Sequence, residues 1–135
     1  MMTLEEAREF FSGDVYATSV SGISIEETGE AYARCSMPVT PQHRNAAGAV
    51  MGGAIFTLAD FAFAVAANVG GVLTVTTTAS VCFVGTCKGD TLYAETRLVK
   101  DGRRSCFFEV TVTDNLGTLV AVVTSTGTHL EKVSS

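Results

Sequence analysis

A single carboxylate, Asp60, stands in the middle of an apolar run that follows the glycine pair Gly52-Gly53. Because removing a carboxylate from water costs several kcal/mol, an aspartate in such a run is usually paired or takes part in chemistry. If the run is a helix, the amides at its start have no acceptor within it, and its dipole adds partial positive charge there. These residues predict a general base or nucleophile and an oxyanion site at the glycines. The simpler alternative is a polar contact that fixes the helix to a neighbour.

Gly53 and Asp60 are two helical turns apart, which corresponds to about 10 Å at ~1.5 Å per residue. That separation is too large for both groups to act on one carbonyl within one chain. In a dimer whose helices lie side by side, Asp60 of one chain can face the Gly53 amide of the other. The spacing therefore favours a site shared between two copies.

The pattern of apolar and turn residues predicts one long helix and six strands. The long helix covers residues 54–68 and is apolar on every side. A short helix over residues 3–12 is expected to begin with a capping box formed by Thr3 and Glu6. The predicted strands are residues 15–27, 30–39, 72–84, 91–100, 103–113 and 118–129.

These elements predict an α+β domain over residues 1–135. The last four strands recur regularly with turn residues between them, which is typical of an antiparallel meander, and Asp101-Gly102 predicts a two-residue type I′ hairpin. The most economical packing wraps a curved six-stranded antiparallel sheet around the long helix. Such a sheet has open edges and covers the helix incompletely, so we expect a homodimer with joined sheets, and a dimer of dimers beyond it.

The composition argues against several classes of protein. The formal net charge is −5, whereas a nucleic-acid-binding domain needs a basic face. The acidic N-terminus does not read as a secretory signal, and Asp60 interrupts the apolar run, so no membrane span is expected. The cysteines at positions 35, 82, 87 and 106 form no CxxC pair. They predict reduced, packed thiols in a cytoplasmic protein, with neither a metal site nor disulfides.

One ordered set of residues resembles a family signature. The set consists of Asn45, Gly48, Gly52-Gly53 and the segment Thr57-Leu58-Ala59-Asp60. It resembles the hotdog-fold acyl-CoA thioesterases, especially the phenylacetate-degradation (PaaI-like) type related to the hydroxybenzoyl-CoA thioesterases. The similarity covers residues 41–129. It implies the hotdog fold, a dimer, and hydrolysis of a thioester without a cofactor.

The resemblance also implies roles for individual residues. Asp60 would act as general base or nucleophile, and the Gly53 amide would polarise the thioester carbonyl. Asn45 would hold the loop or the attacking water. A strand hydroxyl near the carboxylate is usual in the family, and Thr77 is the best match. Strand alternation places Thr77 inward among apolar neighbours, where it could equally be an ordinary core hydroxyl.

Met51 departs from the family pattern, because related enzymes commonly carry histidine directly before the two glycines. Losing one donor at an oxyanion can lower a rate about 10²–10³-fold. A thiolate is nevertheless a good leaving group, since thiol pKa values are about 8.5. A methionine would also line the acyl pocket, beside Gly52 and Phe83. His43 is expected to be an exposed loop residue that does not replace the missing histidine.

CoA is polyanionic, so we expect Arg103 and Arg104 to contact its phosphates, although such residues are more often solvated surface charges. The sequence as a whole predicts a thioesterase that hydrolyses an acyl- or aryl-CoA. One alternative is a hotdog protein that binds acyl-CoA without hydrolysing it, which Met51 favours. Another is a dehydratase or hydratase, which would need a histidine beside the carboxylate.

Overall fold

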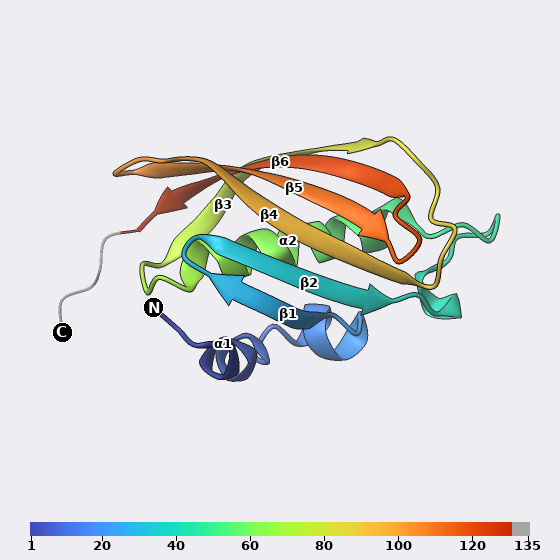
Figure 1. Ribbon diagram of the computed structural model, residues 1–135, viewed down its shortest axis with the longest axis horizontal. Helices are drawn as coiled ribbons and strands as arrows, with labels where there is room; N and C mark the ends of the chain where they lie inside the picture. Colours follow the sequence, from blue (N-terminus) through green and yellow to red (C-terminus); the bar gives the residue numbers. More distant parts are fainter. Residues whose placement is uncertain (131–135) are drawn as a thin grey trace.

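The long helix predicted from the sequence is present as α2, Gly52–Asn68. In the computed structural model, which describes residues 1–130, α2 lies on the concave side of a curved sheet (Figure 1). All six strands contact α2. The end of the expected domain, residues 131–135, lies outside the described residues. Within residues 1–130, no helix is both long and apolar enough to cross a bilayer.

The sheet is antiparallel, with its six strands in the order β1-β2-β4-β5-β6-β3. Its strands are β1 Ser24–Gly29, β2 Tyr32–Pro38, β3 Thr74–Phe83, β4 Thr91–Asp101, β5 Ser105–Asp114 and β6 Leu119–His129. The predicted α+β arrangement of a six-stranded sheet around one helix is therefore confirmed. The predicted meander is wrong for β3, which pairs with β6 instead of β4. Because α2 crosses the sheet between β2 and β3, the strand that follows the helix enters at the far edge.

The N-terminal helix α1, Leu4–Phe11, begins with the predicted capping box. The Thr3 hydroxyl accepts from the Glu6 amide at 3.2 Å, and the Glu6 carboxylate accepts from the Thr3 amide at 3.0 Å. At the other end of α1, Phe11 meets Phe61 of α2 edge to face, with ring centroids 6.0 Å apart. This contact fastens α1 to the central helix.

The segment between α1 and β1 differs from the continuous strand predicted over residues 15–27. Tyr16–Val20 form a π-helical turn, and the strand begins only at Ser24. The Ser21 amide donates to the Tyr16 carbonyl at 2.9 Å, and this hydrogen bond closes the turn. The turn contacts α2 and buries Ala17. Packing against the helix therefore overrides the loose alternation of the sequence.

The β4–β5 connection is longer than the predicted two-residue hairpin. Asp101 pairs with Cys106 inside the ladder, and the Gly102 amide closes the connection by donating to the Ser105 carbonyl at 2.8 Å. A type I′ turn needs positive φ at both central residues, and neither Asp101 nor Gly102 has it. A bulge between Leu98 and Lys100 shifts the pairing just before the turn.

The hydrophobic core lies between α2 and the inner face of the sheet. Phe63 of α2 meets Phe108 of β5 edge to face, with ring centroids 5.4 Å apart. The largest fully buried side chains around them include Met37, Leu58, Val65, Leu92, Val110, Val112 and Val123. Two cysteines, Cys35 and Cys106, are packed here as predicted, whereas Cys82 is exposed on β3. The core fixes the orientation of α2 and therefore of its polar positions.

A buried carboxylate organises the loops at one end of the sheet. Asp114 is 3% exposed, and its two oxygens accept from the amides of Lys88, Gly89, Leu116 and Thr118 at 2.8–3.0 Å. Burial alone would raise the pKa of Asp114, but the four backbone donors outweigh it and hold the pKa well below its usual range. The ionised carboxylate therefore joins the loop before β4 to the β5–β6 turn.

We expect Asp114→Asn to lower the melting temperature at neutral pH, because one amide oxygen cannot accept from four donors. The folded-state pKa lies below the ordinary value of about 3.9. The stabilisation is therefore complete above that pH and is lost as the pH falls through the folded-state value. Thermal unfolding across a pH series should show the gap from wild type closing in acid. The exposed neighbour Asp90 supplies the control, Asp90→Asn, and an equal effect there would contradict the assignment.

Candidate active site

The sheet leaves one stripe of α2 uncovered. Gly53, Thr57, Asp60 and Ala64 follow the i, i+4, i+7, i+11 spacing of one helix face, and none of them is buried. Beside this stripe β3 is exposed along most of its length, and its outer edge has no neighbouring strand within residues 1–130. The glycine and the carboxylate singled out by the sequence therefore share one open surface.

The start of α2 presents free backbone donors. Met51 is the N-cap, and its carbonyl accepts from the amides of Ala54 and Ile55. The amides of Gly52 and Gly53 have no acceptor among residues 1–130. A Cβ built on Gly53 would meet nothing within 4 Å, so an oxygen can approach this amide closely. Met51, 55% exposed, lies beside the opening and supplies no hydrogen-bond donor there.

Asn45 shapes the loop that leads into the helix. Its side-chain oxygen accepts from the amides of Ala47 and Ala49 at 3.0 and 3.1 Å. Arg44 adds a bond of 2.8 Å to the Gly48 carbonyl, and Gly48 adopts φ +85° in this turn. The Asn45 side chain therefore holds the backbone of residues 45–49 in a tight turn.

His43 is buried, so the prediction of an exposed loop histidine is wrong. Its Nδ1 accepts from the Thr40 amide at 3.0 Å, which leaves Nε2 to donate to the Ser21 carbonyl at 2.8 Å. The ring connects the loop before α2 to the segment before β1. Both nitrogens are engaged in this connection, so His43 has no free nitrogen for catalysis.

Phe83 lies against the first turn of α2. A Cβ on Gly52 would be only 2.9 Å from the Cζ atom of Phe83, so a glycine is needed for the ring to lie this close. Phe83 is 50% exposed, and with Val50, Ile55 and Cys87 it lines a groove of about 210 Å³. An apolar surface therefore adjoins the free amides.

Asp60 lies in a groove of about 310 Å³ between α2 and the N-terminal segment. Thr57, Phe61 and Ala64 line the groove from the helix, and residues 14–17 line it from the other side. Burial raises the pKa of Asp60, and the carboxylate of Asp14 raises it further. Asp60 forms no ion pair with the described residues. A partly desolvated, unpaired carboxylate of this kind is suited to accept a proton or attack a carbonyl.

Thr77 does not point inward among apolar neighbours, as strand alternation predicted. The β3–β6 pairing shifts between Thr76 and Thr78, which leaves Thr77 as a bulge. Its side chain is exposed, and its hydroxyl lies 2.7 Å from that of Thr128. The bulge reverses the alternation, a feature that the sequence pattern did not signal.

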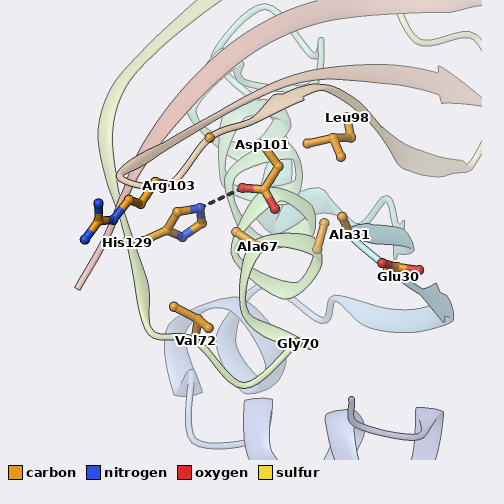
Figure 2. Close-up of a pocket in the computed structure, with 11 residues that line it drawn as sticks. Glu30, Ala31, Ala67, Gly70, Val72, Leu98, Asp101, Arg103 and His129 are labelled. Carbon is orange, nitrogen blue, oxygen red and sulfur yellow. Dashed lines mark hydrogen bonds and ion pairs between the residues drawn. The ribbon is translucent and has the colours of Figure 1, made fainter. Parts of the chain in front are cut away.

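A larger cavity, of about 510 Å³, lies at the other end of α2 (Figure 2). Ala67 and Arg103 help to line it, and His129 points toward Asp101, with Nε2 2.7 Å from Oδ1. The other ring nitrogen of His129 is 2.7 Å from the hydroxyl of Thr74. His129 therefore joins β3, β4 and β6, and no ring nitrogen is left to act as a base.

The two arginines predicted to bind CoA lie near the C-terminal end of α2. Arg103 and Arg104 belong to the β4–β5 connection, and Arg103 lines the cavity beside Ala67. Ala67 is about 21 Å from Gly53 along α2, at ~1.5 Å per residue. Within one chain, the arginines and the free amides therefore lie at opposite ends of the helix.

Sequence reasoning missed two polar features near these sites. One is Asp14, which lies between the predicted helix over residues 3–12 and the predicted strand over residues 15–27 and was given no role. The other is the hydrogen-bonded chain through His129. A polar pair separated widely in the sequence gives no periodic signal, so only the folded arrangement reveals it.

Asp60→Asn should raise the melting temperature at neutral pH, because the wild-type chain must ionise a carboxylate that burial disfavours. Its folded-state pKa lies above the unfolded one, so wild-type stability falls as the pH rises through the interval between them. Thermal unfolding should show the advantage of the variant shrinking toward acid pH. Asp90→Asn should give no such gain; destabilisation by Asp60→Asn at neutral pH would contradict the expectation.

The sequence is similar to a thioesterase family and to individual esterases and thioesterases. A family model described as the thioesterase superfamily matches residues 47–121. A protein of Archaeoglobus fulgidus, "Putative esterase", is 35% identical over 103 residues, which are 76% of this chain and 67% of the relative. The acyl-coenzyme A thioesterase PaaI of Escherichia coli is 29% identical over 119 residues, covering 87% of this chain and 84% of that protein.

Solved structures agree with the architecture. The structure of the E. coli PaaI protein matches with a TM-score of 0.83 at 24% identity, covering 96% of this chain and 97% of the other. A thioesterase of Haemophilus influenzae matches with a TM-score of 0.88 at 20% identity, covering 99% and 94%. These likenesses confirm the hotdog fold expected from the sequence resemblance.

Proposed function

Because this chain belongs to the thioesterase superfamily and is by that membership a thioester hydrolase, we propose that it hydrolyses an acyl- or aryl-CoA to the free acid and CoA. The observation that carries the proposal is the open stripe of α2, with free amides at Gly52-Gly53 and the unpaired carboxylate of Asp60. The name of the E. coli relative, an acyl-coenzyme A thioesterase, supports the choice of thioester.

In the proposed mechanism, the thioester carbonyl accepts a hydrogen bond from the Gly53 amide, where the helix dipole favours developing negative charge. Asp60 of the partner subunit either deprotonates a water that attacks the carbonyl or attacks it directly, giving a mixed anhydride that water then hydrolyses. The C–S bond breaks and CoA leaves as the thiolate. Because thiol pKa values are about 8.5, this departure needs no general acid.

The geometry of the chain supports a shared site. Gly53 and Asp60 are too far apart on α2 to meet, whereas two antiparallel helices packed through their open stripes bring each carboxylate to the opposite glycine. Pairing of two β3 edges would join the sheets at the same interface. The same symmetry would bring Arg103 and Arg104 of one protomer toward the helix start of the other, where they could bind CoA phosphates.

Replacing Asp60 by Asn should lower thioester hydrolysis by at least about 100-fold, the lower range for loss of a general base. The variant should remain folded, as judged by circular dichroism and thermal unfolding. Release of free CoA, followed with a thiol-reactive dye, supplies the rate. Near-normal hydrolysis by a folded Asp60→Asn protein would rule out the assigned role.

A mixing experiment tests whether the site is shared. Gly53→Val covers the amide but has room in the single chain, so both it and Asp60→Asn should be inactive alone. In a mixed dimer, one site combines the intact Asp60 of one protomer with the intact Gly53 of the other. Unfolding and refolding an equal mixture should therefore restore about one quarter of wild-type activity by random pairing in a two-fold dimer. No recovery from mixtures shown by scattering to be dimeric would contradict a shared site.

Met51 supports one alternative, a protein that binds acyl-CoA without hydrolysing it. The position lacks the histidine donor of related enzymes, and Met51 is largely exposed. Calorimetric binding of several acyl-CoA esters, with no CoA released from any of them, would favour this alternative. Release of CoA that is lost in Asp60→Asn would favour the enzyme.

A further inference from the structure

A second aspartate, the exposed Asp14, lines the groove of Asp60. Asp14 enters it from the segment before β1, together with Val15, Tyr16 and Ala17, and faces the helix positions that hold Asp60. The two aspartates come from different elements and meet only in the folded chain. Asp14 and the Tyr16 hydroxyl are the other titratable groups that line the groove, and no lysine, arginine or histidine does so in the described chain.

The backbone around Asp14 is held firmly. Its amide donates to the Phe11 carbonyl at 2.9 Å, and its carbonyl accepts from both the amide and the hydroxyl of Thr18, at 2.9 and 3.0 Å. Three residues further along, Ala17 is buried against the core, and its carbonyl accepts from the Ile23 amide. The position of Asp14 relative to α2 is therefore set by the fold.

The Asp14 carboxylate itself has no compensating partner. It forms no ion pair within residues 1–130, and its hydrogen bonds there are made by backbone atoms alone. A second negative charge in this groove disfavours the ionised form of Asp60. Burial raises the pKa of Asp60, and the negative charge of Asp14 raises it further.

We propose that Asp14 makes Asp60 a stronger base and thereby sets the pH range in which the site works. Asp14 acts through Asp60 and not on the substrate, and its role in hydrolysis rests on the proposed function. When Asp60 accepts a proton, the repulsion between the two carboxylates is relieved, which favours proton uptake. A base that binds its proton more tightly also removes one from water more readily.

The test compares the wild-type protein with Asp14→Asn, which keeps the shape of the side chain and removes its charge. The acid limb of the pH profile of kcat/KM, measured with the best of a panel of acyl-CoA esters, should move to lower pH. Added salt should reduce the difference between the two proteins, because it screens repulsion between partly exposed charges. Asp14→Glu, which keeps the charge, should restore most of the wild-type profile.

The matched control is Glu9→Gln, which changes the net charge equally from an exposed position outside the groove. An unchanged acid limb in Asp14→Asn, or an equal shift in Glu9→Gln, would overturn the proposal. Carbon-13 NMR titration of the Asp60 carboxyl gives a readout that does not need turnover. A lower titration midpoint in Asp14→Asn supports the coupling even if no ester is hydrolysed, and an unchanged midpoint overturns it even if the enzyme is active.

Discussion

The structure depends on how much of α2 a six-stranded sheet can cover. The sheet and the N-terminal segment bury most of the helix, including Phe63 and Leu58, and leave the stripe from Gly53 to Ala64 open. A fully buried carboxylate would need a cation or a set of donors, as Asp114 has. On the stripe, Asp60 is desolvated only in part and keeps an unpaired side chain. Incomplete coverage of one helix therefore produces both the candidate base and the open surface on which we propose that a second subunit packs.

The chemistry left to this site is limited by the histidines. The sequence contains two, and the fold uses both ring nitrogens of His43 and of His129 in hydrogen bonds that hold separate segments together. A reaction that needs a free imidazole beside the carboxylate, such as a dehydration, is therefore poorly served. Thioester hydrolysis needs a base or nucleophile and an oxyanion site, because the leaving thiolate is stable without a proton donor.

The sequence predicts the parts of the fold that rest on periodicity and local signals. The apolar helix, the capping box at Thr3 and the extent of the later strands follow from patterns that act over a few residues. Strand order does not, because the pairing of β3 with β6 depends on where α2 delivers the chain. The π-helical turn at Tyr16–Val20 and the bulge at Thr77 were also missed, since packing and register decide both.

For the site, a similar distinction holds. Asp60 and the two glycines were identifiable because a charge and a helix start stand out in an apolar run, and the fold places them on one open face. The burial of His43 and the approach of Asp14 to Asp60 were not, because each joins segments that only tertiary structure brings together. The roles of Thr77, Arg103 and Arg104 toward substrate stay predictions, because these residues would act together with residues of a second chain.

The exposed edge of β3 has a consequence for how the protein behaves outside catalysis. This strand is rich in threonine and valine, residues that favour sheet formation, and it carries no charged side chain or proline to discourage pairing. A folded monomer would therefore expose an edge strand that can form backbone hydrogen bonds with any other unpaired strand. If two copies cover this edge, dilution removes the protection, and resistance to heat and to aggregation would then depend on protein concentration by mass action.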